Sequence, residues 1–247
     1  ASPQGGQGTQ QGGDNTQQPV ANVEILPKKV TKIVMTHSAE ELEYTYLFDT
    51  QGRIISDSRT YRGKMERIKT YTYTDKTITC LRDGEPSYVY NLENGRIVSE
   101  KNVESGSVYK YSYSSDGYLA SITLTSETRS LLGTFTISGG NYTKYEEKET
   151  AIDEGWEDWE EASMSYSSKL NNLNVDLASI LIEMPMCVYC GNRTKNLPST
   201  IIWTWGDDDE TDTEVDNFSY TYDGDYITKV VEELSDGDVY TYEIFYE

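Results

Sequence analysis

Histidine, cysteine and long apolar runs are scarce in this sequence, and each shortage argues against a class of site. The 247 residues include a single histidine, His37, and three cysteines, Cys80, Cys187 and Cys190. A structural zinc ion takes four nitrogen or sulfur ligands, which this chain can hardly supply, so no zinc site is expected. Three cysteines do not favour a disulfide framework, and Cys187 and Cys190 are expected to be buried thiols or one incidental disulfide.

Signals for catalysis and for membrane-spanning helices are missing as well. Nucleophilic catalysis needs a histidine or lysine partner, and His37 is expected at a strand end or in a loop. The longest apolar stretch, residues 177–186, is interrupted by Ser179, Glu183 and Pro185, whereas a membrane-spanning helix needs about 20 apolar residues. No phosphate-binding loop is present. We therefore expect neither an enzyme nor a helical membrane protein, and no cofactor.

Basic residues are outnumbered, since 21 lysines and arginines face 42 aspartates and glutamates, for a net charge of −21. Such a charge repels phosphate backbones and anionic membrane surfaces, so nucleic acid is not expected as a partner. It is typical of a soluble protein in an exposed compartment. The alternative is a surface that collects divalent cations or basic ligands.

Residues 2–20 are rich in Gln, Gly, Thr and Asn and nearly devoid of apolar side chains. A segment of this composition cannot bury a core. Residues 1–22 are therefore predicted to be a disordered polar tether, and residues 23–247 a single all-β domain. Such a tether is typical of a bacterial lipoprotein whose signal peptide and acylated cysteine have been removed.

Tyrosine, by contrast, is abundant, with 21 residues, many of them placed at period two. In residues 43–48, 70–74 and 110–114, aromatic residues alternate with smaller ones, mostly threonine and serine. This alternation predicts strands whose tyrosines are buried and whose hydroxyl residues face the other side. The strands run into turns such as Asn94-Gly95 and then into a strand that begins with Ile or Leu. Hairpins in series predict an all-β fold, an antiparallel meander that curves or closes into a barrel-like sheet.

One segment departs from this pattern and shows apolar residues at helical spacing: Leu173, Leu177, Ile180 and Leu181. Asn174 is expected to cap the helix, Asp176 to lie in its first turn and Pro185 to end it. Residues 173–183 are therefore predicted to form one short amphipathic helix that lies on the sheet or plugs it.

Two blocks, Asn-Val-Asp-Leu at residues 174–177 and Gly-Asn-Arg-Thr-Lys-Asn-Leu-Pro at residues 191–198, accompany the Tyr-x-Tyr hairpins. Together they resemble a lipoprotein family of the Bacteroidetes, a domain of unknown function with a porin-like fold. The resemblance covers residues 30–247, and the Lys-Asn-Leu-Pro block is its most specific part. It implies a curved or closed antiparallel sheet and a cell-envelope location, and it implies no activity and no functional residues.

The porin-like fold does not by itself predict a barrel in lipid. A lipid-facing strand needs an apolar outer face, whereas the faces opposite tyrosine here carry Thr, Ser, Lys and Glu, as in residues 66–70. We expect the barrel to stand in water. Its attachment to the outer membrane of a Gram-negative bacterium would be through an N-terminal lipid anchor alone, on the periplasmic or the outer side.

An acidic segment with two tryptophans is the first candidate site. Trp156 and Trp159 flank Glu157 and Asp158. Indole rings are costly to leave in water, and aromatic faces beside hydrogen-bonding carboxylates often hold sugars, so these four residues are predicted to bind a ligand. The alternative is that one or both tryptophans pack onto the barrel mouth.

The second candidate is a hairpin tip with three consecutive aspartates, Asp207, Asp208 and Asp209. Calcium takes about 6–8 oxygen ligands, often from Asp-rich loops, so this tip is a candidate calcium site. The run lacks the D-x-D-x-D-G order of a calcium loop, and a solvated tip is the alternative. Trp203 and Trp205, on the preceding strand, are predicted to lie in the core or half in it.

Three functions remain open at this point. The first is a non-catalytic envelope lipoprotein that binds a ligand such as a glycan or a peptide. The second is a structural or adhesive surface protein that contacts other envelope proteins through an exposed strand edge or a tyrosine-rich face. The third, a carboxylate-based glycoside hydrolase, requires two acids that face each other across a deep cleft.

Overall fold

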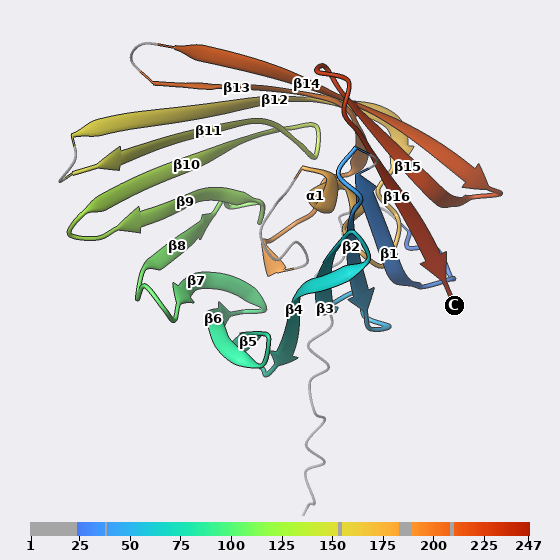
Figure 1. The fold of residues 1–247 in the computed structure, drawn as a ribbon, viewed down its shortest axis with the longest axis horizontal. Helices are drawn as coiled ribbons and strands as arrows, with labels where there is room; N and C mark the ends of the chain where they lie inside the picture. Colours follow the sequence, from blue (N-terminus) through green and yellow to red (C-terminus); the bar gives the residue numbers. More distant parts are fainter. Residues whose placement is uncertain (1–23, 38, 153–154, 183–188, 208–209) are drawn as a thin grey trace, which may run out of the picture.

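The computed structural model describes residues 24–37, 39–152, 155–182, 189–207 and 210–247 of the chain. These residues form sixteen strands and one short helix (Figure 1). The strands are β1 (Val30–His37), β2 (Leu42–Phe48), β3 (Ile54–Tyr61), β4 (Lys64–Tyr73), β5 (Thr77–Arg82), β6 (Glu85–Glu93), β7 (Arg96–Asn102), β8 (Val108–Tyr113), β9 (Leu119–Thr125), β10 (Arg129–Ser138), β11 (Asn141–Ala151), β12 (Trp156–Leu170), β13 (Asn196–Gly206), β14 (Thr211–Asp223), β15 (Tyr226–Leu234) and β16 (Val239–Tyr246), and the helix is α1 (Leu177–Leu181). Among the described residues, no helix has the length and apolar character to cross a bilayer.

All sixteen strands belong to one antiparallel sheet in which each pairs with its neighbours in sequence. The sheet closes because β1 also pairs with β16, with Ile33 opposite Ile244 and Met35 opposite Tyr242. The predicted all-β antiparallel barrel with one short helix is therefore confirmed. Every described strand has a partner on both sides, so the described part of the sheet has no free edge.

The tyrosines face the inside of the barrel, as the period-two pattern predicted. Tyr71 and Tyr73 of β4 pack against the core, whereas Thr70 and Thr72 of the same strand are exposed. The turn between β6 and β7 also follows the prediction. Its Asn94 and Gly95 both have positive φ angles, 51° and 74°, as the tight turn of a two-residue hairpin requires.

The recurring Tyr-x-Tyr motif has a specific structural role on the inner face of the barrel. The hydroxyl of Tyr73 donates a hydrogen bond to the carbonyl oxygen of Ile54 on the neighbouring strand β3. The hydroxyl of Tyr71 donates to Asp57 Oδ2 at 2.6 Å. The Arg53 guanidinium lies over the Tyr73 ring, 4.8 Å from its centroid.

The same arrangement recurs in the next copy of the motif. The hydroxyl of Tyr113 donates to the carbonyl oxygen of Ile97, that of Tyr111 donates to Glu100 Oε2 at 2.7 Å, and Arg96 lies 5.4 Å from the centroid of the Tyr113 ring. A Gly-Arg-Ile turn followed by an acid and a later Tyr-x-Tyr is thus one structural unit, used twice. These tyrosines hold neighbouring strands together and are committed to the core.

Glu100, the acid of the second copy, makes the free energy of unfolding depend on pH. Burial raises the pKa of the Glu100 carboxyl above its ordinary value, although the Tyr111 hydroxyl and the Lys69 ammonium favour the charged form. Because the folded pKa exceeds the unfolded one, this contribution to stability is complete below the unfolded pKa and is lost as the pH rises through the folded pKa. Glu100→Gln is therefore expected to unfold at a higher temperature than the wild type at pH 7. The melting temperature rises by about 2–4 °C for each 1 kcal/mol gained in the free energy of unfolding.

Thermal denaturation from pH 4 to pH 8 tests this expectation. The gap between Glu100→Gln and the wild type should shrink toward pH 4, where the wild-type carboxyl is mostly protonated in both states. Glu93→Gln, an exposed change on β6, controls for the lost charge. A gap that does not vary with pH would contradict the assignment to Glu100.

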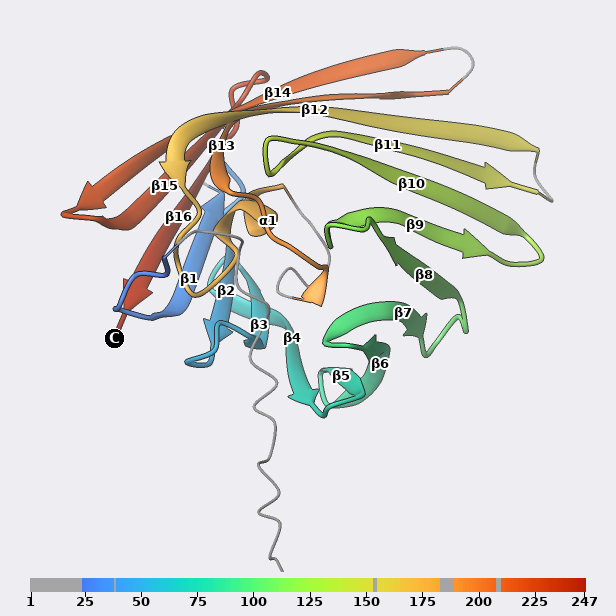
Figure 2. The same ribbon diagram turned by 180° about the vertical axis from the view of Figure 1, so that it is seen from behind.

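Part of the inside of the barrel is filled by the plug segment, defined here as residues 171–182 and 189–195. Figures 1 and 2 show α1 within the space that the strands enclose. Leu173, Val175 and Leu177 of this segment are at most 1% exposed and belong to the same core as the inward strand residues. The barrel therefore has a packed apolar core at this level rather than an open channel.

The helix occurs where it was predicted, but its start is different. Asp176, not Asn174, is the N-cap, because its carboxylate accepts a hydrogen bond from the backbone N–H of Ser179. Asn174 instead binds the first strand: its Oδ1 accepts from the Val30 N–H at 2.7 Å, and its Nδ2 donates to the Val30 carbonyl at 3.2 Å. The helix ends at Leu181, and the predicted stop at Pro185 lies outside the described residues.

A buried polar network holds the plug segment in shape. The Asp176 carboxylate accepts hydrogen bonds from Asn171 Nδ2 at 2.6 Å and from Ser179 Oγ at 2.7 Å. Arg193 Nη1 donates to the carbonyl oxygens of Leu173 and Val175 at 2.7 and 2.9 Å. Burial raises the pKa of the Asp176 carboxyl, and the nearby charge of Arg193 opposes that rise. The predicted signature blocks around residues 174–177 and 191–198 thus meet inside the barrel.

The described cysteines and the histidine are buried. Cys80 and Cys190 are 0% and 3% exposed, and burial raises the pKa of the Cys80 thiol. Cys187 lies outside the described residues. His37 is the last residue of β1, as predicted, with its ring stacked on Tyr240 at 4.5 Å and its Nε2 3.1 Å from Asp238 Oδ2.

Candidate functional site

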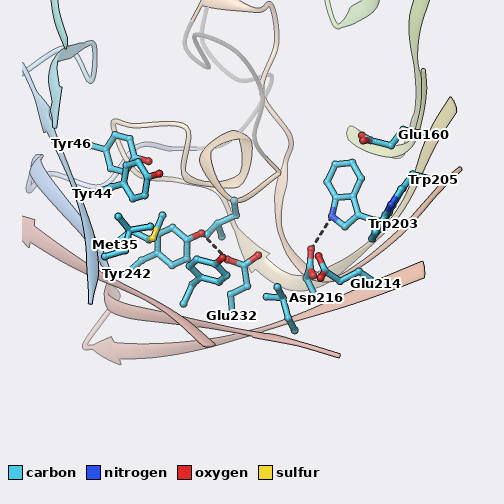
Figure 3. Close-up of a pocket in the computed structure, with 14 residues that line it drawn as sticks. Met35, Tyr44, Tyr46, Glu160, Trp203, Trp205, Glu214, Asp216, Glu232 and Tyr242 are labelled. Atoms are coloured by element: carbon cyan, nitrogen blue, oxygen red, sulfur yellow. Dashed lines mark hydrogen bonds between the residues drawn. The ribbon is translucent and has the colours of Figure 1, made fainter. Parts of the chain in front are cut away.

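A pocket of about 620 Å³ lies inside the barrel beside the plug segment (Figure 3). Leu181 of α1 contributes to its lining. The other lining residues come from strands on both sides of the barrel closure, β1 and β2 on one side and β12 to β16 on the other. The pocket therefore exists only because the sheet closes around the plug.

One wall of the pocket is aromatic. Tyr44 and Tyr46 of β2 lie beside Met35 of β1 and Tyr242 of β16 in Figure 3. The Tyr44 and Tyr46 rings are nearly parallel, with centroids 6.5 Å apart. Tyr44 and Tyr46 are in the same period-two phase as the buried Leu42 of β2, so they point inward.

The facing wall carries two tryptophans of β13, Trp203 and Trp205, which are two residues apart and so project from the same face of the strand. Trp203 Nε1 donates a hydrogen bond to Asp216 Oδ2 at 2.8 Å, which fixes the orientation of the indole. Trp205 is 37% exposed. The prediction that both lie in or half in the core holds for Trp203, which packs against the core, whereas Trp205 is outside it.

Four carboxylates also line the pocket: Glu160, Glu214, Asp216 and Glu232. Asp216 and Glu232 are only 5% and 8% exposed. The Tyr242 hydroxyl donates to Glu232 Oε2 at 2.7 Å, as Trp203 does to Asp216. A buried carboxylate is costly unless it is hydrogen-bonded, and these two are held by the polar atoms of the aromatic walls.

A second pocket of about 430 Å³ continues from the first toward the ends of the long strands, since Glu160 and Trp205 line both. Glu147, Asp158 and Asp212 are among the acids that it adds. Among the described residues, no lysine, arginine or histidine lines either pocket. Basic side chains do contact residues of the lining. Arg129 pairs with Glu149. Arg59 and Arg67 lie 5.8 and 6.0 Å from the centroid of the Tyr44 ring, and His37 stacks on Tyr240.

The residues of the first predicted site, 156–159, lie on opposite faces of β12. Trp156 and Trp159 lie three residues apart in β12 and so project from opposite faces. Asp158 and Trp159 line the second pocket, whereas Trp156 lines neither and Glu157 pairs with Lys148 at 2.7 Å. The structure therefore does not bring the two tryptophans together as one platform.

The second predicted site is described only in part. Asp207 lies at the tip of the hairpin between β13 and β14, where its Oδ1 accepts from the Glu210 N–H at 3.0 Å. Asp208 and Asp209 lie outside the described residues. Within the part of the chain that the structure describes, no group of three or more His, Cys, Asp or Glu side chains is arranged to hold a metal ion. A calcium site here stays a prediction.

Of the acids that line the pockets, the sequence pointed to Asp158 and Asp207, and it did not identify the others, although a signal for three of them was present. On β14, Asp212, Glu214 and Asp216 precede Phe218 and Tyr220 in steps of two. Because Phe218 faces the core, the three acids in the same phase must face inward too. The alternate-residue pattern of Tyr220 and Phe218, extended toward the start of β14, reaches these three acids.

No protein-family model and no curated protein matches this chain. Among solved structures, it is similar to a porin-like protein from Bacteroides uniformis ATCC 8492, with 16% identity and a TM-score of 0.57 over 92% of this chain and 100% of the other. A second porin-like protein, from Bacteroides vulgatus ATCC 8482, has 13% identity and a TM-score of 0.58 over 89% and 99%. The chain shares the fold of these porin-like proteins. The porin-like fold is thus confirmed, while membership of the lipoprotein family stays a prediction.

Proposed function

We propose that this protein is a non-catalytic binding protein of the cell envelope and that its ligand, a glycan or a peptide, occupies the pocket inside the barrel. The observation that carries the proposal is the pocket itself, a cavity of about 620 Å³ between a tyrosine wall and a tryptophan wall. Ligand sites are typically preformed cavities of about 300–1,000 Å³ with aromatic walls and a few fixed polar groups.

Two features favour the pocket as a binding site over a packing defect. Trp205 remains 37% exposed at the junction of the two pockets, although neighbouring inward residues such as Ile201 are fully buried. Two hydrogen bonds fix side chains of the lining: Trp203 donates to Asp216, and Tyr242 donates to Glu232. Fixed side chains reduce the entropy that is lost when a ligand binds.

An envelope location accords with the outward faces of the strands. Thr70 and Thr72 on β4 and Lys110 and Ser112 on β8 are exposed to the outside of the barrel. These polar residues, which share the outer face with exposed Ile68 and Val108, support a barrel in water, attached to the outer membrane by a lipid anchor on the periplasmic or outer side. The fold shared with the two Bacteroides proteins and the polar composition of residues 1–22 support the same proposal.

The rival functions receive less support. A structural protein that pairs through a free strand edge loses its basis, because every described strand is paired on both sides. A glycoside hydrolase would also need facing carboxylates, and the pocket does contain Glu160 and Glu214. Incubation with candidate glycans tests this: release of reducing ends that stops in Glu160→Gln would contradict the non-catalytic proposal.

Binding is tested by thermal shift against a panel of glycans and peptides. A ligand at about 100 times its dissociation constant adds about 2.7 kcal/mol, which raises the melting temperature by about 5–11 °C for a chain of this size. In Trp205→Ala, we expect affinity for that ligand to fall about tenfold or more, because the indole is a wall of the pocket. Phe245→Ala, an exposed aromatic on β16 outside the pocket, should bind as the wild type does. Equal binding by Trp205→Ala would place the ligand elsewhere.

A further inference from the structure

We propose that the ligand of the connected pockets is an extended peptide with basic residues at alternate positions, an inference that rests on the proposed function and specifies its ligand. The pockets join aromatic walls to carboxylates at regular spacing, and no basic side chain lines them among the described residues. Three features support it: charge, the aromatic faces and the spacing of the acids.

The charge of the lining selects for a cation. The first pocket holds Glu160, Glu214, Asp216 and Glu232, and its other described lining residues are uncharged. Asp216 and Glu232 are more than nine-tenths buried, so water screens them poorly. A guanidinium or ammonium that enters would form charge-assisted hydrogen bonds and offset the repulsion among these acids. The hydroxyls of a neutral glycan supply hydrogen bonds without offsetting the charge.

The aromatic faces also suit cationic side chains. Trp205 is partly exposed where the two pockets meet, and Glu160, its cross-strand partner, lines both pockets. An arginine stacks on an indole face while its nitrogens bind a carboxylate, because its charge is spread over a planar group. A tryptophan next to an acid is therefore a suitable receptor for a guanidinium group.

The spacing of the acids matches that of a peptide. Asp212, Glu214 and Asp216 follow each other at every second position of β14, which places them about 6.6–6.8 Å apart along the strand. An extended peptide presents its own alternate side chains at the same interval. A compact cation such as calcium does not extend over this spacing. The alternate basic residues of an extended peptide, by contrast, match it along the two pockets.

Isothermal titration with two matched peptides tests the proposal. The first is Arg-Gly-Arg-Gly-Arg-Gly with blocked termini, and the second replaces each arginine with citrulline, a neutral side chain of nearly the same shape. We expect the arginine peptide to bind about tenfold or more tightly than the citrulline peptide and to weaken as the salt concentration rises. Equal affinities would overturn the role of charge. Spermidine is the third probe, and binding as tight as that of the arginine peptide would overturn the assignment to a peptide.

Paired variants place the peptide in the pocket. Glu160→Gln/Glu214→Gln removes two pocket charges, and Glu233→Gln/Glu243→Gln removes two exposed charges from β15 and β16. Both variants change the net charge equally, so long-range attraction is matched. The first is expected to bind the arginine peptide about tenfold more weakly or worse, and the second as the wild type does. Equal loss in both would overturn the pocket as the site.

The outcomes separate the inference from the proposed function. If a neutral glycan binds, depends on Trp205 and the arginine peptide does not bind, the peptide inference fails while the proposed function stands. If neither glycans nor peptides bind, both fail. Melting temperatures of the unliganded variants identify any that do not fold, and Glu214→Gln alone then replaces the double variant in the comparison.

Discussion

Replacing Arg193 with methionine is expected to lower the free energy of unfolding by about 3 kcal/mol. Its guanidinium donates hydrogen bonds to the carbonyl oxygens of Leu173 and Val175 and is the positive charge beside the buried Asp176 carboxylate. Removing one member of a buried charged pair costs about 3–5 kcal/mol, because the other charge is left without compensation. Since Arg193 is half-buried, we expect the lower end of that range.

A second variant separates charge from packing. In Arg193→Met/Asp176→Asn, no charge is left in this network, and the asparagine side chain can still accept the hydrogen bonds of the N-cap. The double variant should therefore regain part of the stability that Arg193→Met loses. Urea unfolding at pH 7 measures both. A loss below about 1 kcal/mol in Arg193→Met would mean that the plug segment does not depend on this network.

Replacing Gly52 with alanine is the second change for which we expect a large loss, of about 3 kcal/mol or more. Gly52 has a φ of +78°, and a methyl group there would overlap the backbone carbonyl oxygen of Asn174 in the plug segment. The left-handed conformation costs an L-residue about 1–2 kcal/mol, and crowding in a packed interior adds about 1–3 kcal/mol. The turn between β2 and β3 must then move away from the plug.

Gly84→Ala is the matched control for this change. Gly84 has a similar φ of +91°, but a methyl group there would meet no atom within 4 Å. We expect only the conformational cost of about 1–2 kcal/mol. The difference between the two variants in thermal or urea unfolding therefore measures the contact between the turn and the plug. Equal losses would show that this contact contributes nothing.

The hairpins could be predicted because each rests on local chemistry. Alternating Tyr and Thr fixes which face of a strand is buried, and Asn94-Gly95 fixes a tight turn, without reference to distant parts of the chain. The closure of the sheet depends instead on β1 meeting β16, and no local pattern specifies that Ile33 lies opposite Ile244. Strand number and register decide closure together, and neither can be read from one segment.

The plug and the site show the same division between local and distant effects. Helical spacing located α1, but the choice of Asp176 over Asn174 as its cap depended on Val30, which takes both polar atoms of Asn174. For the site, clustering of acids and tryptophans in sequence drew attention to residues 156–159. The pocket instead gathers Trp205 and Glu232 from separate strands, and their proximity follows from the barrel alone.

The position of the plug segment within the chain has a consequence for how the protein is made. The plug follows β12, and Asn174, which binds Val30, comes 144 residues after it. At about 5–20 residues per second, the ribosome takes about 7–29 s to synthesise that interval. During this time twelve strands have emerged, and their inward tyrosines, leucines and isoleucines have no partner to cover them. The nascent chain therefore exposes a large apolar surface for seconds. In that state a holding chaperone would prevent aggregation.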